Sequence, residues 1–206
     1  AQLYNVSKNS VKYFGVNSTL TGNRDGSGAA GQDAIAIGAN ATSSNISSIA
    51  IGNHSTASGS YSMAQGFQAN ASAQYSIAQG YGANASGHTS IAYGQYATAT
   101  NTSAIAIGYC VSATASGASA VGTGANATEQ AAAAFGAGAN AKGISSVAIG
   151  AVSNATGLAA TAIGTVSNAS GNYSLAQGAF ANATGNYSIA IGNASNAAGL
   201  QSIAQG

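Results

Sequence analysis

A glycine stands at every fourteenth position from Gly38 to Gly206, and the spacing between these glycines never changes. An alanine lies two residues before each of them, from Ala36 to Ala204. A period of this length, held over so many copies, is typical of a solenoid in which each copy forms one turn and contacts only its neighbours. We therefore expect one continuous repetitive body rather than one or two ordinary globular domains.

Small and larger residues alternate in two short stretches of each turn. Examples are Ser188-Ile189-Ala190-Ile191-Gly192 and Ala181-Asn182-Ala183-Thr184. Alternation with a period of two indicates β-strands. We predict an all-β parallel β-roll, or β-solenoid, with one 14-residue repeat and two short strands per turn, each strand pairing with its copies above and below. About thirteen such turns occupy residues 25–206. At a rise of about 4.8 Å per turn they would extend over roughly 60 Å.

Glycine and asparagine recur at both corners between the two strands. One corner holds the periodic glycines, and the other holds residues such as Gly59, Gly185 or Asn101. Both residue types tolerate positive φ. We therefore expect positive φ at both corners of the turn.

Side-chain size predicts which residues lie inside the coil. Two alanine columns, represented by Ala190 and Ala183, should pack against each other in the narrow interior, and the larger aliphatic residues should point outwards in two columns on one face. Burying each of these would contribute about 1.5 to 3 kcal/mol. A long apolar stripe is rare on soluble monomers, so we predict an interface between copies related by closed cyclic symmetry.

The residues predicted at this interface are the isoleucines of the two columns: Ile35, Ile37, Ile49, Ile51, Ile77, Ile91, Ile105, Ile107, Ile149, Ile163, Ile189 and Ile191. Glutamine replaces the second isoleucine in some turns, which favours columns that meet near a symmetry axis, where equivalent glutamines can hydrogen-bond. These residues are Gln65, Gln79, Gln177 and Gln205.

Residues 1–24 lie outside the repeat, and we interpret them as an N-terminal strand and cap segment. The run Val11-Lys12-Tyr13-Phe14-Gly15-Val16 is rich in residues that favour strands. Lysines on an exposed strand edge discourage pairing with other chains, which is what the end of a solenoid requires.

Ser-Ile-Ala-Ile-Gly at 188–192, together with Asn-Ala-Thr-Gly at 182–185, resembles the head repeats of trimeric autotransporter adhesins, the YadA-like heads of Gram-negative outer surfaces. The resemblance covers about residues 29–206. It implies a left-handed β-roll, a homotrimer with the apolar columns at its centre, and a role in virulence through attachment to host matrix proteins or receptors. Collagen, fibronectin and CEACAM-type receptors are the implied ligands.

The resemblance also implies display on the bacterial cell surface. We expect a truncated head, anchored in the outer membrane through a C-terminal region absent here. The sequence departs from the pattern where Ser119 and Ala133 interrupt the isoleucine column. We expect looser packing over residues 109–136.

Composition argues against several classes of function. Charged residues make up 3 % of the chain and the net charge is +1, so we expect no nucleic-acid partner and no membrane contact by this segment. Few groups could carry chemistry, and the two histidines lie in different turns at unrelated repeat positions. These groups are Asp25, Asp33, Glu129, His54, His88 and Cys110. We therefore predict that the chain is not an enzyme and has no catalytic residue, no cofactor and no metal site.

Aromatic residues are the better candidates for binding a partner, because protein-binding surfaces are enriched in them. Several aromatic residues lie close together in the third of the array that contains Tyr61 to Tyr96. Residues at the same repeat position should stack one turn apart, which predicts an aromatic ladder there. We predict receptor contact by Tyr61, Phe67, Tyr75, Tyr81 and Tyr96. Alternatively, the corner tyrosines only cover strand edges.

Three alternatives to an adhesin head stay open for the whole chain. The first is a passive structural spacer that projects another adhesive domain. The others are a phage fibre head and an ice-binding solenoid. The Asn-x-Ser/Thr sequences, such as 182–184, follow from the repeat itself, and we expect them to be unglycosylated.

Overall fold

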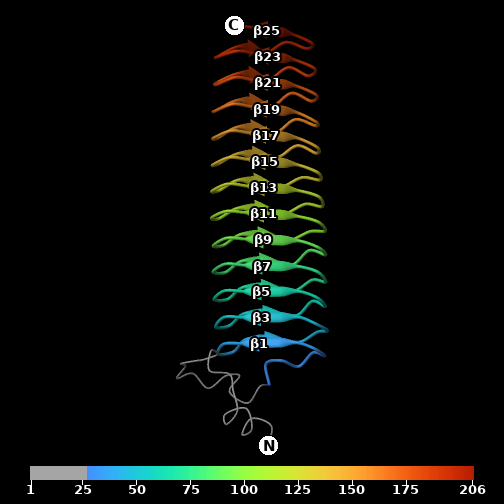
Figure 1. Ribbon diagram of the computed structural model, residues 1–206. Coiled ribbons are helices and arrows are strands. Elements are labelled where there is room, and N and C mark those ends of the chain that lie inside the picture. The colour runs from blue at the N-terminus through green and yellow to red at the C-terminus, as the bar shows by residue number, and fades with distance from the viewer. Residues whose placement is uncertain (1–26) are drawn as a thin grey trace, which may run out of the picture.

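The computed structural model describes residues 27–206, which form a straight stack of flattened coils (Figure 1). Twenty-five short strands build two parallel sheets, one of 13 strands and one of 12, on the two broad sides of the stack. The predicted all-β parallel solenoid with two strands per turn is therefore confirmed.

The 13-stranded sheet contains the odd-numbered strands, each three residues long. These are β1 (Ile35–Ile37), β3 (Ile49–Ile51), β5 (Met63–Gln65), β7 (Ile77–Gln79), β9 (Ile91–Tyr93), β11 (Ile105–Ile107), β13 (Ser119–Val121), β15 (Ala133–Phe135), β17 (Val147–Ile149), β19 (Thr161–Ile163), β21 (Leu175–Gln177), β23 (Ile189–Ile191) and β25 (Ile203–Gln205).

The 12-stranded sheet contains the even-numbered strands, each two residues long. These are β2 (Thr42–Ser43), β4 (Thr56–Ala57), β6 (Asn70–Ala71), β8 (Asn84–Ala85), β10 (Thr98–Ala99), β12 (Ser112–Ala113), β14 (Asn126–Ala127), β16 (Asn140–Ala141), β18 (Asn154–Ala155), β20 (Asn168–Ala169), β22 (Asn182–Ala183) and β24 (Asn196–Ala197). Both strands of each turn are shorter than the alternating sequence stretches suggested.

Every strand pairs with its copy one repeat further along the chain. Ile35 pairs with Ile49 and Asn182 pairs with Asn196, so equivalent residues lie directly above one another. Twelve complete turns follow Gly38. In the first turn the described residues hold a single bridge, between Ala29 and Ser43, in place of the short strand.

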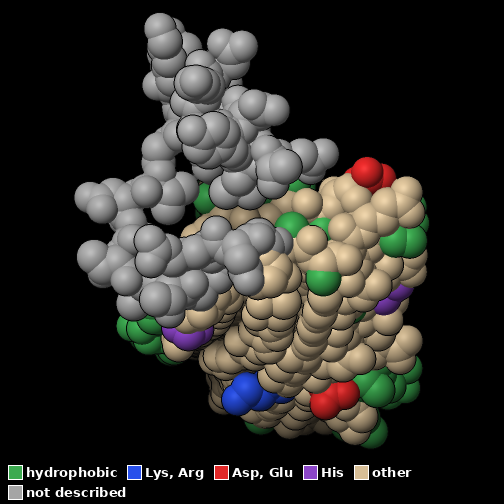
Figure 2. Space-filling model, turned by 90° about the horizontal axis from the view of Figure 1, so that it is seen from below, with side chains coloured by type: hydrophobic (Ala, Val, Ile, Leu, Met, Phe, Trp, Pro, Cys, Tyr) green, Lys and Arg blue, Asp and Glu red, His purple; other side chains and the backbone are tan. Residues whose placement is uncertain are grey.

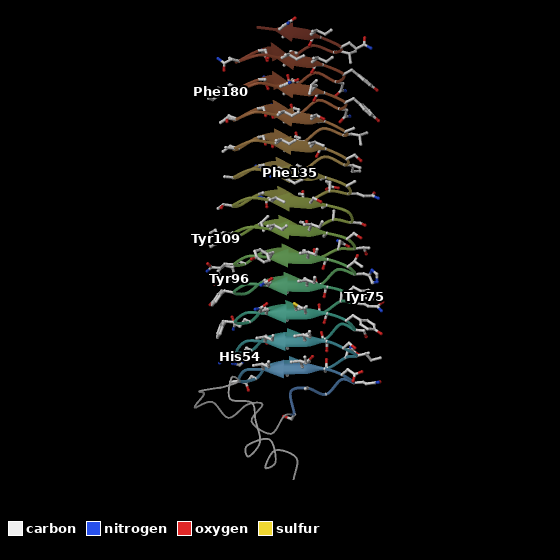
Figure 3. The ribbon with its side chains drawn as sticks, viewed as in Figure 1. His54, Tyr75, Tyr96, Tyr109, Phe135 and Phe180 are labelled. Atoms are coloured by element: carbon white, nitrogen blue, oxygen red, sulfur yellow. The ribbon has the colours of Figure 1, made fainter. Side chains whose placement is uncertain are left out.

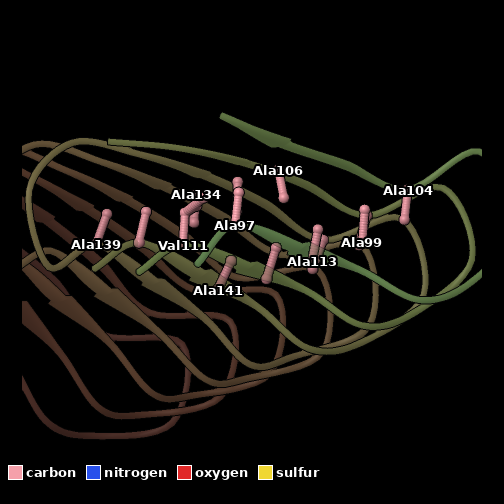
Figure 4. Close-up of a cluster of buried hydrophobic side chains, with 14 of the residues drawn as sticks. Ala97, Ala99, Ala104, Ala106, Val111, Ala113, Ala134, Ala139 and Ala141 are labelled. Atoms are coloured by element: carbon pink, nitrogen blue, oxygen red, sulfur yellow. The ribbon is translucent and has the colours of Figure 1, made fainter. Parts of the chain in front are cut away.

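Small side chains fill the interior of the stack, as predicted (Figure 4). The two predicted alanine columns are buried except at Ala36 and Ala204, near the ends of the stack, and Ala106 and Ala113 are examples of fully buried members. Two further columns, at Ala97 and Ala104 and their copies, complete the interior, and serine replaces alanine there in many turns, as at Ser90. Ser, like Ala, is small enough for this narrow space.

Most of the buried serines hydrogen-bond to the backbone of their own corners, which makes their hydroxyl groups compatible with the interior, whereas the hydroxyl groups of Ser62 and Ser188 have no partner. Ser174 Oγ donates to the carbonyl oxygen of Gly171 over 2.6 Å, and Ser153 Oγ donates to that of Gly150 over 2.9 Å. The alternation of alanine and asparagine in the sequence did not predict this serine contribution.

Both corners contain positive φ, as the sequence suggested, but at only one of them is the periodic glycine the residue that adopts it. From Gly38 to Gly192 the periodic glycines have φ between 113° and 138°, and an added Cβ would collide with the next periodic glycine. At the other corner only the assignment of positive φ to the glycine was wrong, because Gly59 has no positive φ. It instead allows close approach, since an added Cβ would overlap the carbonyl oxygen of Ala73. Positive φ occurs two residues later, at Tyr61 and its copies.

The irregular section at residues 109–136 keeps the interior and the register of the stack. Strands β13 and β15 pair in register with their neighbours, and Ala120 and Ala134 are fully buried. Any loosening would therefore concern only the outward positions of Ser119 and Ala133. The N-terminal strand and cap predicted for residues 1–24 lies outside the described residues.

Candidate interaction surfaces

The flattened coil presents two broad faces and two narrow edges. The apolar face is the outer side of the 13-stranded sheet, and the polar face is the outer side of the 12-stranded sheet. The glycine edge is the corner just after each periodic glycine, at positions such as Phe67, Tyr96 and Val152. The tyrosine edge is the opposite corner, at positions such as Tyr75 and Leu158.

Every isoleucine predicted at an interface between copies lies on the apolar face, and none of these side chains is buried. Ile107, Ile149 and Ile191 are 38 %, 41 % and 39 % exposed. The outward orientation is therefore confirmed. Contact between copies stays a prediction.

Asparagine side chains form a hydrogen-bonded ladder along the polar face. Asn154 Nδ2 donates to Asn168 Oδ1 over 2.9 Å, and Asn168 donates in turn to Asn182 over 2.8 Å. The same bond joins Asn182 to Asn196. The amides are thus used within the stack, and Lys142 is the only charged residue among the outward positions of this face in the described turns.

Most of the surface seen along the axis consists of uncharged polar groups and backbone (Figure 2). Hydrophobic side chains gather at the periphery in this view, and charged groups are few and isolated. No helix of the described residues has the length and apolarity needed to cross a membrane.

The aromatic residues stack as predicted, but on opposite edges rather than in one ladder. On the tyrosine edge the rings of Tyr61 and Tyr75 lie 5.3 Å apart and nearly parallel. On the glycine edge Phe67 stacks on Tyr81 at 5.2 Å, and Tyr81 meets Tyr96 edge-on at the same distance. The five candidate contact residues therefore do not form one patch on a single copy. Figure 3 shows Tyr75 on one side of the stack and Tyr96 on the other.

Two exposed tyrosines of the glycine edge have perturbed acidity. Hydrogen bonding with Tyr81 raises the pKa of Tyr96 above its ordinary value. Hydrogen bonding with the neighbouring Cys110 side chain raises the pKa of Tyr109 in the same way. Both shifts favour the neutral phenol.

The residues with potential for catalysis or metal binding remain apart in the fold. Within residues 27–206 no three His, Cys, Asp or Glu side chains come together in a group that could hold a metal ion. His54 contacts the amide of Asn40 at 3.3 Å and the ring edge of Phe67, and His88 lies against Tyr75 on the other edge. The histidines thus belong to the stacked side chains of the edges.

Several exposed apolar residues were missed by the sequence interpretation. Val152, Val166 and Phe180 lie on the glycine edge, and Ile144 and Leu158 lie on the tyrosine edge. Each group recurs at one position of the repeat, so a column-by-column comparison of large residues would have revealed them.

Comparison with known proteins supplies the family. The model of the YadA head domain repeat, which spans two copies, matches residues 29–55, 57–83, 71–97, 85–109, 128–153, 141–167, 155–181, 169–195 and 183–206, well over half of the chain. No curated protein matches the chain.

Among solved structures, the collagen-binding domain of the Yersinia adhesin YadA is similar, with 23 % sequence identity and a TM-score of 0.27. The match covers 84 % of this chain and 66 % of that structure, just under two thirds of its length. Because the family model matches turn after turn from residue 29 to residue 206, the chain belongs to the family of YadA head domain repeats.

Proposed function

We propose that this chain is the head of a bacterial surface adhesin, a homotrimer of left-handed β-rolls that attaches to host matrix proteins or cell-surface receptors without catalysis. Collagen, fibronectin and CEACAM-type receptors are the proposed ligands. Membership of the YadA head family supports the adhesive role. On this proposal the head is displayed at the cell surface and anchored in the outer membrane through a C-terminal region beyond this sequence.

The exposed apolar face is the main support for the proposed trimer. Its 13 strands at about 4.8 Å spacing give a length of roughly 60 Å, and a width of about 10 Å makes the face about 600 Å². This area is comparable with the roughly 800 Å² that each partner buries in a standard interface. Three chains around one axis would cover this face on every copy, which no open arrangement achieves.

The proposed receptor contacts are Tyr61, Phe67, Tyr75, Tyr81 and Tyr96. Because they lie on opposite edges, one ligand could touch both groups only where two copies meet side by side. Three equivalent copies of such a composite site would raise the apparent affinity of a weak contact through avidity.

Two measurements test this function. Multi-angle light scattering should give three times the chain mass of 19.5 kDa. The trimer should then bind at least one of immobilised collagen, fibronectin and CEACAM-type receptors. A monomer at all concentrations would contradict the assembly, and absence of binding across the panel would contradict the adhesive role.

A passive spacer is the second candidate, favoured by the unbroken register of the sheet over all 13 long strands. A rod of this kind could hold another domain away from the cell. Combined replacement of Tyr61, Phe67, Tyr75 and Tyr81 by serine separates the two candidates. Loss of binding by an intact trimer supports an adhesin that binds through these residues, whereas absence of binding by the unsubstituted trimer favours the spacer.

A further inference from the structure

The two narrow edges of the stack carry bulky apolar side chains at the same levels of the rod. Over residues 46–96 the glycine edge carries His54, Phe67, Tyr81 and Tyr96, and the tyrosine edge carries Ile46, Tyr61, Tyr75 and His88. Over residues 144–187 the glycine edge carries Val152, Val166 and Phe180, and the tyrosine edge carries Ile144, Leu158, Tyr173 and Tyr187.

Bulky apolar side chains are also absent from both edges in the same turns of the rod. In the section between, which we call the bare belt (residues 116–138), the glycine edge holds Gly124 and Gly138 at the positions of Tyr96 and Val152. The tyrosine edge holds Gly117 and Ala131 at the position of Tyr75. The match is not perfect: Tyr109 of the glycine edge lies level with small polar residues, and Leu200 of the tyrosine edge follows Ala194 of the glycine edge.

Contact within one copy does not explain this agreement. The edges lie at opposite ends of the flattened coil, as the labels of Tyr75 and Phe180 show in Figure 3. Ring contacts join residues along each edge, and no such contact joins the two edges within the described residues.

Backbone conformation does not explain the bulky residues either. Val152, Val166 and Phe180 all have φ of 57°, a region that glycine adopts freely and that disfavours β-branched and bulky residues. Gly124 and Gly138 occupy the same position with φ of 64° and 65°. Moreover, Val152 is 56 % exposed and Phe180 is 58 % exposed. These side chains are unfavourable in conformation and in exposure for an isolated coil, which points to a function outside it.

We propose that the tyrosine edge of one copy packs against the glycine edge of the next copy at matching levels, forming two apolar seams separated by the bare belt. The inference rests on the proposed trimer. The seam takes up one side of the side chains proposed as receptor contacts, so a ligand would touch only their outer sides. When three copies face one axis with their apolar faces, the ring closes only if each glycine edge lies beside the tyrosine edge of its neighbour. Contacts in the seams then form in those turns where both edges carry bulky side chains.

The seams also fix the register of the copies along the axis. The apolar face repeats with every turn, so sliding one copy by whole turns changes the central contacts little. A slide of a few turns would instead place bulky edge residues of one copy against the bare belt of the next. Such a slide removes the match between the bulky sections of the two facing edges. The seams therefore favour copies whose equivalent turns lie at the same position along the axis.

Disulfide cross-linking across the edges tests this seam. In a Cys110→Ser background, which removes the exposed native thiol, Tyr75→Cys is combined in turn with Phe67→Cys, Tyr81→Cys and Tyr96→Cys. The three combinations allow for an offset of one turn between copies. Because the two cysteines of one chain lie on opposite edges, a bond can form only between chains. At least one combination should give a covalent trimer on a non-reducing denaturing gel.

The controls separate the seam from the trimer itself. Tyr75→Cys alone and Ser72→Cys with Tyr81→Cys, which places one thiol on the polar face, should give no covalent trimer. Circular dichroism confirms that each variant keeps its strands. A trimer by light scattering with no cross-link in any of the three combinations would overturn the seam and leave the proposed assembly intact. A monomeric Cys110→Ser parent would overturn the assembly and the seam together.

Discussion

Replacing Ile107 and Ile149 together by asparagine tests whether the apolar face holds the copies together. Both side chains point out of the coil, so the interior should be unaffected. Asparagine already occupies outward strand positions such as Asn182, so the coil tolerates this residue. The substitutions therefore change the face without a change in the fold.

The expected loss follows from the exposed surface of the two residues. Ile107 and Ile149 are 38 % and 41 % exposed in one copy, so an interface would bury about two fifths of each side chain. Full burial of isoleucine contributes about 1.5 to 3 kcal/mol, which gives about 1 kcal/mol for each site. Six such sites in a trimer sum to about 6 kcal/mol, or about a 10⁴-fold weaker association constant at 1.4 kcal/mol per factor of ten.

Sedimentation velocity over a dilution series, with circular dichroism on the same samples, measures this effect. The double variant should dissociate to folded monomer at concentrations where the parent remains trimeric. Thr156→Asn, an exposed position on the polar face, is the matched control and should leave association unchanged. A double variant that stays trimeric over the whole range would show that this face is not the interface.

Three further outcomes are expected. Asn168→Ala removes two ladder hydrogen bonds and should lower the free energy of unfolding by about 1 to 3 kcal/mol in thermal denaturation, whereas Thr156→Ala should change it little. Ala106→Leu inserts extra volume where the side chain is 0 % exposed, and should destabilise the fold by at least about 1 to 3 kcal/mol in the same assay. Because the pKa of Tyr96 is raised by hydrogen bonding with Tyr81, the neutral phenol stabilises the fold at neutral pH, and this contribution should disappear as the pH rises through the raised pKa. Tyrosinate absorbance, compared with a Tyr96→Phe reference, should show late ionisation of Tyr96 that Tyr81→Phe reduces.

The sequence predicted the strands and the orientation of their side chains because comparison of many repeat copies reveals the shared pattern despite substitutions in single turns. A single Ser-Ile-Ala-Ile-Gly stretch could be a strand of many folds, but its recurrence at a constant spacing leaves one way to stack it. Side-chain size then predicted which residues point inwards, since Ala190 fits a narrow interior and Ile189 does not. The residues of the interior were thus predicted from the steric exclusion of large side chains rather than from strand propensity.

The corners were predicted less well because composition does not distinguish two uses of glycine. Gly185 was assigned to positive φ, yet the fold uses such glycines for close approach of consecutive turns. Positive φ falls instead on residues such as Tyr187 and Val166, which sequence propensity would place there last. The division of the aromatic residues between two edges was missed for a related reason: it depends on where the chain turns, and not on which residues share a repeat position.

The strict pairing of each strand with its copy one repeat later has a consequence for how such a protein can change length. An insertion or deletion of one whole repeat adds or removes about 4.8 Å of rod and leaves every remaining pair intact. A change by any other number of residues would misplace the corners, or turn alanines outwards and isoleucines inwards, in the neighbouring coil. Gene duplication in units of a single repeat is therefore the mildest route by which a lineage could lengthen or shorten its reach.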